Sequence, residues 1–189
     1  MIYLVRHGET EFNLVRRYQG WLDSPLTENG VAQAIAIGRR LAKLPDAATA
    51  EIVASPIGRA KRTAELIAAE MGRADIAHDD RLREISIGSW DGLDRDEIAA
   101  RAPGIFDGYD GSWYFRTPDG ETYDEFAGRI GESLAALAGR NAIVVTHGVV
   151  TRVLRGIYAG LPRAEAFRLP APQDRFYRLA DGRITEVAA

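Results

Sequence analysis

Two short apolar segments that lie far apart in the chain each end in a histidine followed by a glycine, and this repeated pattern limits the fold more than any other feature. Residues 2–5 are apolar and lead to Arg6 and His7, and residues 142–145 are fully apolar and lead to His147. Short apolar runs with β-branched members predict buried strands. Because ligands of open α/β sheets bind at the carboxyl ends of the strands, both histidines are expected at the mouth of one site.

The rest of the chain alternates between predicted helices and predicted strands, without an internal repeat or a linker. At 189 residues the chain fits one domain, so residues 1–189 are expected to form a single folded unit. Residues 11–21 and the tail from residue 160 to residue 174 are expected to be loops. Apolar spacing, cap residues and turn residues predict helices over 27–44, 55–72, 94–102 and 122–139 and after 148, and further strands over 51–54, 76–78, 175–179 and 183–187.

Charge and residue usage exclude several classes of protein. A net charge of -3 and a pI near 5.7 argue against nucleic acid or an anionic membrane as a partner, because both need a broad basic face. The chain has no cysteine and no apolar stretch of membrane-spanning length, so we expect a soluble cytoplasmic protein. It has no GxxxxGK[ST] motif, no GxGxxG after a strand and no GxSxG elbow, which removes three common enzyme classes.

Arg59 is unusual because it falls in the first turns of a predicted helix. The helix macrodipole favours anions at this end, so a cation there costs stability unless an anion is bound. Arg59 therefore fits a bidentate contact to a phosphate at the helix N-terminus, whereas a surface ion pair is preferred for Lys61 and Arg62. Arg6, which ends the first predicted strand beside a histidine, also indicates anion handling.

Glu84 is a carboxylate flanked by apolar residues in the stretch 82–93. Such a setting beside a phosphate dianion suits a proton donor near neutral pH. An ion pair with Arg81 or Arg83 explains the same pattern equally well, and the residues alone leave both interpretations open.

The amides of Asn13 and Gln19 lie in the polar and aromatic stretch 11–21. They can donate hydrogen bonds to a bound anion, although amides that only stabilise the loop are the simpler explanation. Arg16 and Arg17 are expected to be solvated. Gly148 opens a predicted helix whose first backbone N–H groups point toward whatever His147 faces.

Residues 103–120, the lid segment, differ in character from the rest, because glycines alternate there with aromatic residues such as Tyr109 and Trp113. A long loop in a compact domain is usually functional or disordered, and the aromatics argue against disorder. We expect a lid or wall over the site, with aromatics that merely cover the core as the alternative. Arg116 fits either a contact to a substrate or a salt bridge.

Several blocks of the chain resemble the histidine phosphatase superfamily, branch 1, the phosphoglycerate mutase-like enzymes. The triplet Arg6-His7-Gly8 resembles the RHG motif of that family, and Thr146-His147-Gly148 resembles the block around its second histidine. Four longer stretches also resemble family blocks: GETEFN at 8–13, GWLDSPLT at 20–27, SPIGRAKRTA at 55–64 and LREISIGSWDG at 82–92. The resemblance extends over roughly the whole chain.

The resemblance implies an α/β fold, a three-layer α/β/α sandwich with a mostly parallel central sheet. The alternation of predicted strands and helices is consistent with it, and the C-terminal hairpin indicates one antiparallel member.

The resemblance also implies roles for the candidate residues. His7 would attack phosphorus to give a phosphohistidine, while Arg6, Arg59 and His147 hold the phosphate oxygens. Glu84 would protonate the leaving oxygen and later deprotonate the attacking water. The phosphate contacts would further include Asn13, Gln19 as a weaker candidate, and Gly148.

The function implied is that of a metal-independent phosphoric monoester hydrolase acting on a small phosphorylated molecule, without a cofactor. Zinc is conceivable with two histidines and a glutamate, but arginines directed at the same point repel a cation. A cofactor-dependent phosphoglycerate mutase is one alternative, although family mutases are longer near the lid than this chain allows. A non-catalytic phosphate-binding domain is another, although such domains usually lack a catalytic residue. A homodimer stays open.

Overall fold

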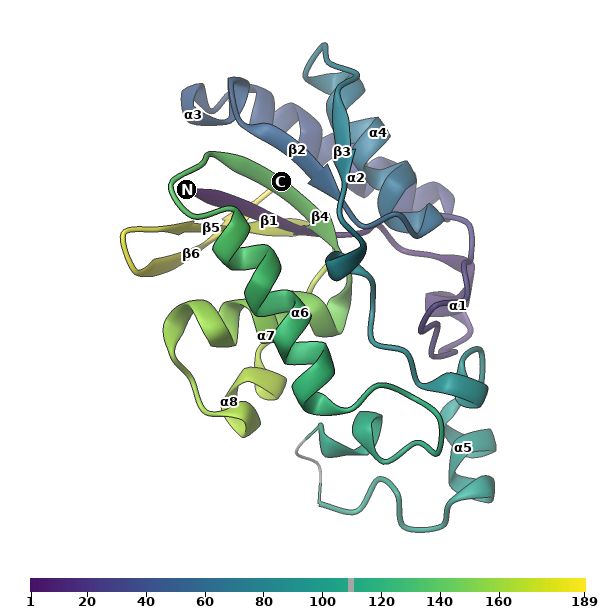
Figure 1. Cartoon of the computed structure of the whole chain (residues 1–189). Helices are drawn as coiled ribbons and strands as arrows, with labels where there is room; N and C mark the ends of the chain where they lie inside the picture. The colour runs from purple at the N-terminus through teal and green to yellow at the C-terminus, as the bar shows by residue number, and fades with distance from the viewer. Residues whose placement is uncertain (109–110) are drawn as a thin grey trace.

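The computed structural model describes residues 1–108 and 111–189, so the predicted lid residue Tyr109 lies outside the described residues. A sheet of six strands lies between two layers of helices (Figure 1). The strands are β1 (Ile2–Arg6), β2 (Glu51–Ala54), β3 (Ile76–His78), β4 (Ala142–Thr146), β5 (Arg175–Ala180) and β6 (Arg183–Ala188). The helices are α1 (Glu11–Leu14), α2 (Glu28–Ala42), α3 (Pro45–Ala48), α4 (Gly58–Glu70), α5 (Arg95–Arg101), α6 (Tyr123–Ala136), α7 (Gly148–Ala159) and α8 (Arg163–Arg168), with short 3₁₀ helices η1 (Asp80–Leu82), η2 (Gly88–Trp90) and η3 (Ser112–Phe115).

The sheet has the strand order β3-β2-β4-β1-β5-β6. Strands β1 and β4 pair in parallel, with Val5 opposite Val145, and β2 and β3 continue the parallel part. Strand β5 pairs antiparallel with both β1 and β6, so it is the one strand that runs against the other five. The predicted sandwich with a mostly parallel sheet and one antiparallel member is confirmed.

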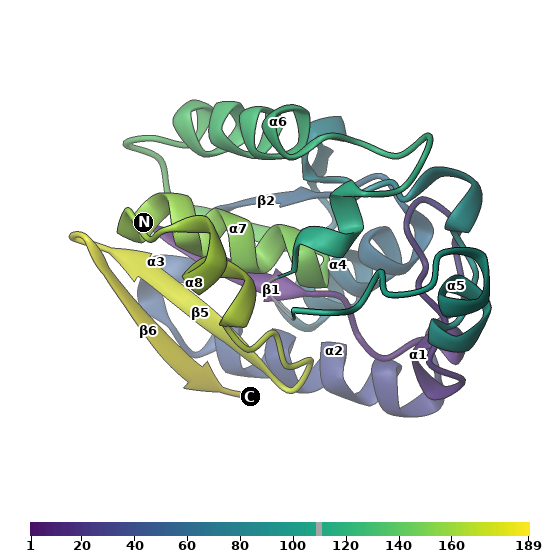
Figure 2. The same ribbon diagram turned by 90° about the horizontal axis from the view of Figure 1, so that it is seen from below.

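Both faces of β1 are buried over residues 2–5, which explains why this part of the strand is apolar. Tyr3 and Val5 belong to a core cluster with α2 and α4, while Leu4 belongs to a second cluster with α6 and α7. The view from below shows α2 on one side of the sheet and α6 and α7 on the other (Figure 2). This burial fixes the end of β1, and therefore the backbone that leads into His7. Among the described residues, no helix combines the length and the apolar character needed to cross a membrane.

The lid segment forms a small core of its own beside the main one. Trp113, in η3, is buried with Trp90 and Ile98, and Phe106 packs against this cluster. Arg116 donates a hydrogen bond to the carbonyl of Ile105 in the same segment. The aromatics thus build a packed wall, and the two earlier interpretations of this segment are both partly correct.

The elements that differ from prediction are short helices and one helix start. Residues 11–14 form α1 because Thr10 and Asn13 make a capping box, where a loop was expected. Helix α8 interrupts the predicted loop of the tail. Helix α4 begins at Gly58, two residues later than a cap at Ser55 predicts, and the Ser55 hydroxyl contacts His147 at 2.7 Å as well as accepting from the backbone N–H of Ile57 at 3.3 Å.

Candidate active site

A cleft of about 300 Å³ opens at the carboxyl ends of β1 and β4. Most of the predicted site residues line it, and His147 lies directly behind, with its ring 5.2 Å from that of His7. The structure thus brings together residues that are up to 142 positions apart, as the parallel pairing of the two strands requires. The predicted residues that line the cleft are Arg6, His7, Asn13, Gln19, Arg59, Glu84 and Gly148.

His7 is buried and held in a defined orientation. Its Nδ1 lies 2.8 Å from the carbonyl oxygen of Gly8, so this nitrogen carries the proton and donates it. Its Nε2 accepts a long hydrogen bond of 3.3 Å from Nε of Arg59, which places the lone pair on Nε2. Burial lowers the pKa of His7 well below 6.5, and the charges of Arg59 and Arg6 lower it further. The imidazole is therefore neutral at physiological pH.

Arg59 is almost completely buried in the first turn of α4. Its guanidinium donates to the carbonyls of Leu22 at 2.6 Å and Gly20 at 2.8 Å, and it lies 3.7 Å from the carboxylate of Asp23. Burial lowers the pKa of Arg59, while Glu84 and Asp23 oppose this shift. Arg59 thus links α4 to the loop over residues 19–23 and keeps a positive charge next to His7.

Arg6 lies at the start of α7, close to Gly148. A Cβ atom on Gly148 would lie 3.3 Å from Nε of Arg6, so glycine lets the guanidinium lie close to the helix N-terminus. One arm of Arg6 donates to the carbonyl of Ala171, and its buried Nε has no hydrogen-bond partner among the described residues. Burial lowers the pKa of Arg6 to about 10, so Arg6 remains a cation at neutral pH.

His147 caps α7 and is fully buried. Its Nε2 lies 2.7 Å from the hydroxyl oxygen of Ser55, while Nδ1 has no partner within the described part of the chain. Burial lowers the pKa of His147 well below 6.5, with smaller contributions from Arg59 and His7. The two strand-terminal histidines therefore share one buried, electropositive pocket.

Glu84 places its carboxylate at the N-terminus of α7. The backbone N–H of Val149 donates to Oε2 at 3.2 Å, and the N–H of Val150 donates to Oε1 at 3.3 Å. The ion pairs considered for Glu84 are not formed, because Arg81 pairs with Asp79 and Arg83 pairs with Asp80. The carboxylate is left facing the cleft.

Asn13 and Gln19 both line the cleft, but their roles in the structure differ. The side-chain oxygen of Asn13 accepts from the backbone N–H of Thr10 and from Nε2 of Gln173 at 2.9 Å. Gln173 also donates to the carbonyl of His7 at 3.2 Å. Sequence reasoning missed Gln173, since no motif marks it. Gln19 is buried, and its Oε1 has no partner among the described residues.

Further arginines line the cleft that the sequence did not single out. Arg16 is exposed, as expected, whereas Arg17 is half-buried and pairs with Glu97; both border the cleft. Arg152 lines it from α7, four residues after Gly148 and hence on the same side of the helix, a spacing that could have indicated it. Tyr114 adds an aromatic wall from the lid segment. The mouth of the cleft is therefore strongly cationic in a protein of net charge -3.

The chain offers no cluster of three or more metal-ligating side chains in the part that the structure describes. Around His7, the nearest charges are the guanidinium groups of Arg59 and Arg6, which attract anions. The arrangement can bind a tetrahedral oxyanion beside a neutral imidazole nitrogen, with a carboxylate on its far side.

Comparison with known proteins gives the same picture over nearly the whole chain. A family model described as the histidine phosphatase superfamily (branch 1) matches residues 2–180. A protein of Salmonella arizonae named "Probable phosphoglycerate mutase GpmB" is 39% identical over 170 residues, which span 85% of this chain and 75% of that protein.

Two solved structures show that the similarity extends to the fold. Bacillus stearothermophilus YhfR superposes with a TM-score of 0.83 at 33% identity, covering 99% of this chain and 95% of its own. A mycobacterial glucosyl-3-phosphoglycerate phosphatase superposes with a TM-score of 0.76 at 28% identity, covering 99% and 96%. Both alignments include the strands that carry the two histidines.

Proposed function

Since the chain belongs to the histidine phosphatase superfamily (branch 1), we propose that it is a phosphatase that hydrolyses a small phosphorylated substrate through a phosphohistidine on His7. One observation carries this proposal. A neutral, oriented histidine, the buried Arg59, the partly buried Arg6 and a carboxylate face a single cleft of about 300 Å³. Unaided phosphate monoester hydrolysis is so slow that catalysis needs several such groups together.

In this mechanism, Nε2 of His7 attacks phosphorus and the bond to the leaving oxygen breaks. The hydrogen bond from Nδ1 to the carbonyl of Gly8 supports this assignment, because it leaves the lone pair on Nε2. The depressed pKa of His7 keeps that lone pair available below neutral pH. The result is a phosphohistidine, which water then cleaves to return the free imidazole and inorganic phosphate.

Charge on the transferred phosphoryl group is stabilised from several sides. Arg6 and Arg59 supply guanidinium donors, and the N-terminus of α7 adds its dipole and the backbone N–H of Gly148, since the N–H groups of Val149 and Val150 donate to Glu84. The unpartnered Nδ1 of His147 supports a direct contact to a phosphate oxygen. Asn13 and Gln19 complete the phosphate contacts from the loop side.

Glu84 acts as the general acid and then as the general base. It protonates the oxygen of the departing alcohol in the first step and takes a proton from the attacking water in the second. The pairing of Arg81 with Asp79 and of Arg83 with Asp80 supports this role, because it leaves the Glu84 carboxylate at the cleft without either of these arginines.

The substrate is expected to carry a second acidic group. Arg16 and Arg152 lie at the cleft beyond the pair that surrounds His7, and no acidic partner of either is found among the described side chains. A cation at a cleft mouth contributes most when it meets an anion of the ligand. A phosphorylated acid would bind with its phosphate beside His7 and its second acidic group beside Arg16 and Arg152.

A cofactor-dependent phosphoglycerate mutase is the second candidate. The Salmonella relative supports it, since its name is that of a mutase and it is 39% identical. The same phosphohistidine would then return its phosphoryl group to the substrate instead of to water. Without the additional lid segment that the family's mutases carry, we rank this function second.

The test is inorganic phosphate release from a panel of phosphorylated metabolites, including 3-phosphoglycerate, in the presence of EDTA. A His7→Ala variant serves as the control and is expected to release none. Isomerisation of phosphoglycerate that requires 2,3-bisphosphoglycerate, without net phosphate release, would favour the mutase. Binding of phosphate without either reaction would leave a non-catalytic phosphate-binding domain.

A further inference from the structure

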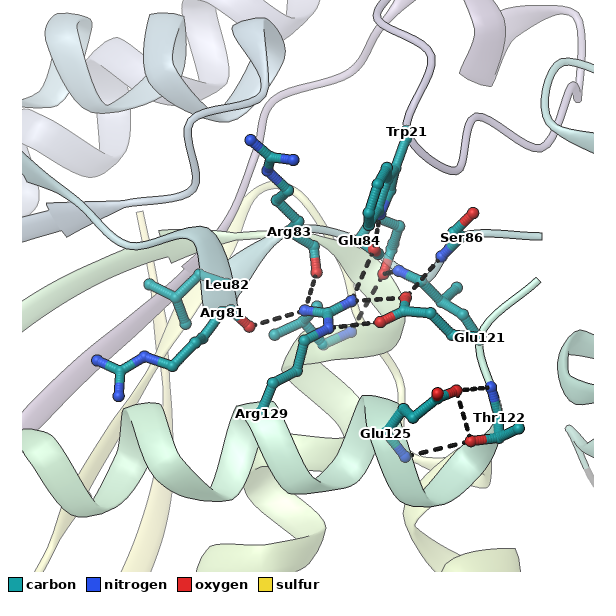
Figure 3. Close-up of polar contacts among 12 residues, drawn as sticks. Trp21, Arg81, Leu82, Arg83, Glu84, Ser86, Glu121, Thr122, Glu125 and Arg129 are labelled. Carbon is teal, nitrogen blue, oxygen red and sulfur yellow. Dashed lines mark hydrogen bonds and ion pairs between the residues drawn. The ribbon is translucent and has the colours of Figure 1, made fainter. Parts of the chain in front are cut away.

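Arg129 of α6 holds the backbone of the segment that carries Glu84, although it does not line the cleft (Figure 3). One terminal nitrogen of its guanidinium donates to the carbonyl of Arg81 at 2.7 Å and of Arg83 at 2.6 Å. The other terminal nitrogen donates to the carbonyl of Glu84 at 2.9 Å. Three backbone carbonyls near Glu84 thus converge on one side chain.

Glu121 completes the set of partners of Arg129. Its carboxylate accepts hydrogen bonds from Nε of Arg129 at 2.7 Å and from Nη2 of Arg129 at 2.8 Å, which makes a bidentate ion pair. Both side chains of this pair are less than a fifth exposed. The carboxylate also accepts from the backbone N–H of Ser86 at 2.8 Å, and the N–H of Glu121 donates to the carbonyl of Ser86. Because Glu121 directly follows the lid segment, the pair joins the end of the lid to the strip of backbone on either side of Glu84.

The carbonyl of Glu84 is held from a second direction as well. Nε1 of Trp21 donates to it at 2.8 Å, from the loop that Arg59 fixes (Figure 3). The carbonyl of Glu84 is therefore hydrogen-bonded both to α6 and to the 19–23 loop, while its side chain lines the cleft. A shift of Arg129 would move the carboxylate relative to the phosphate without removing any group that touches substrate.

We propose that Arg129, with Glu121 as its counter-ion, is a positioning residue that sets the distance between the Glu84 carboxylate and the leaving oxygen. This inference rests on the proposed role of Glu84 as general acid. The arginine is specifically required, because its five N–H donors are matched by five hydrogen bonds, and lysine has only three donors. A displacement of about 1 Å in a catalytic group is enough to lower the rate strongly.

The experiment compares kcat/KM of Arg129→Lys and Glu121→Gln on two phosphate monoesters that differ in leaving group. An alkyl phosphate needs a proton on its departing oxygen, whereas p-nitrophenyl phosphate departs as a stable phenolate. We expect kcat/KM to fall at least about 10-fold on the alkyl phosphate and less than about 3-fold on p-nitrophenyl phosphate. Glu84→Gln should show the same selective loss, and Arg129→Lys should add little to it in the double variant.

The matched control is Arg73→Lys. Arg73 is similarly buried, pairs with Asp75 and donates to the carbonyls of Ala48 and Ala50, but it lies away from the cleft. The control should leave the ratio of the two substrates unchanged. If Arg129→Lys does not fold, as judged by its thermal unfolding, Glu121→Gln carries the test.

The outcomes separate this inference from the proposed function. A selective loss in Glu84→Gln that is missing from both Arg129→Lys and Glu121→Gln overturns the positioning role alone, as does an equal loss on both substrates. No selective loss in Glu84→Gln refutes the acid role, and with it this inference. If the unaltered protein hydrolyses neither ester, the proposed function fails first.

Discussion

Replacing Thr63 by valine tests how the backbone beside His7 is held in place. Thr63 is fully buried in α4, where its hydroxyl donates to the carbonyl of Arg59 at 2.8 Å and accepts from the backbone N–H of Gly8 at 3.1 Å. Gly8 in turn orients His7 through its carbonyl. Valine preserves the shape of the side chain and removes both hydrogen bonds.

The magnitude follows from the groups left without a partner. The carbonyl of Arg59 can still accept a hydrogen bond within the helix, but the N–H of Gly8 becomes a buried, unpaired donor, which costs about 1–3 kcal/mol. The backbone has no room to turn toward another acceptor, because even a Cβ at Gly8 would lie 2.3 Å from the carbonyl oxygen of Gly30. For a chain of this size, each kcal/mol lowers Tm by about 2–4 °C.

Thr151→Val is the matched control in urea and thermal unfolding. Thr151 is also fully buried in a helix, and its hydroxyl donates to the carbonyl of His147 at 2.6 Å, but no backbone N–H of the described residues donates to it. The difference between the two variants in the free energy of unfolding isolates the N–H of Gly8 and should be about 1–3 kcal/mol. Equal destabilisation of both variants would refute the reasoning. Thr63→Val should also lower kcat, since His7 loses part of its support.

Three further predictions concern pH, charge and metals. Burial keeps the pKa of His7 and His147 well below 6.5, so below pH 6.5 the unfolded chain takes up protons that the native state does not, and the free energy of unfolding should fall by up to about 1.4 kcal/mol per pH unit for each histidine. When the free energy of unfolding is measured in urea at a series of pH values, His7→Asn should remove about half of the pH dependence that the two histidines cause. An unchanged pH dependence would contradict this prediction. Steady-state kinetics of Arg16→Ala and Arg152→Gln should give a KM about 10-fold higher for a phosphate monoester with a second acidic group, but nearly unaltered for p-nitrophenyl phosphate; equal changes on both would argue against an anion subsite. Phosphate release should persist after dialysis against EDTA, and activity restored only by zinc would show that a metal is required.

Local signals in the sequence predicted much of the fold. The cap residues Thr27, Asp94 and Thr122 each begin a helix as expected, since cap chemistry depends on residues three or four positions away. The predicted start of α4 was two residues too early. The Ser55 hydroxyl also contacts His147, a residue 92 positions away in the sequence, which local signals do not reveal.

The candidate site likewise contains residues that local sequence signals indicated and residues that they did not. His7, Arg59 and Glu84 could be picked out from the sequence because each lies within a longer motif. The structure brings all three to one cleft. Gln173 and Arg129 carry no such mark, because their partners are supplied by segments that only the tertiary fold brings near. The contacts that indicate a role for Gln173 and Arg129 form only in the folded chain, so a single sequence does not reveal them.

The position of β1 in the sheet has a consequence for how the protein is made. Strand β1 lies between β4 and β5, so both of its neighbours come from the last 50 or so residues of the chain. During synthesis on the ribosome, the strand that leads to His7 emerges before both of its neighbours, with four apolar residues and no partner, and the 135 residues between β1 and β4 are translated before β4 appears. The nascent chain therefore depends on being shielded from aggregation for most of its synthesis, and a product that stops short of β4 would contain His7 without the second histidine or the strands that hold it.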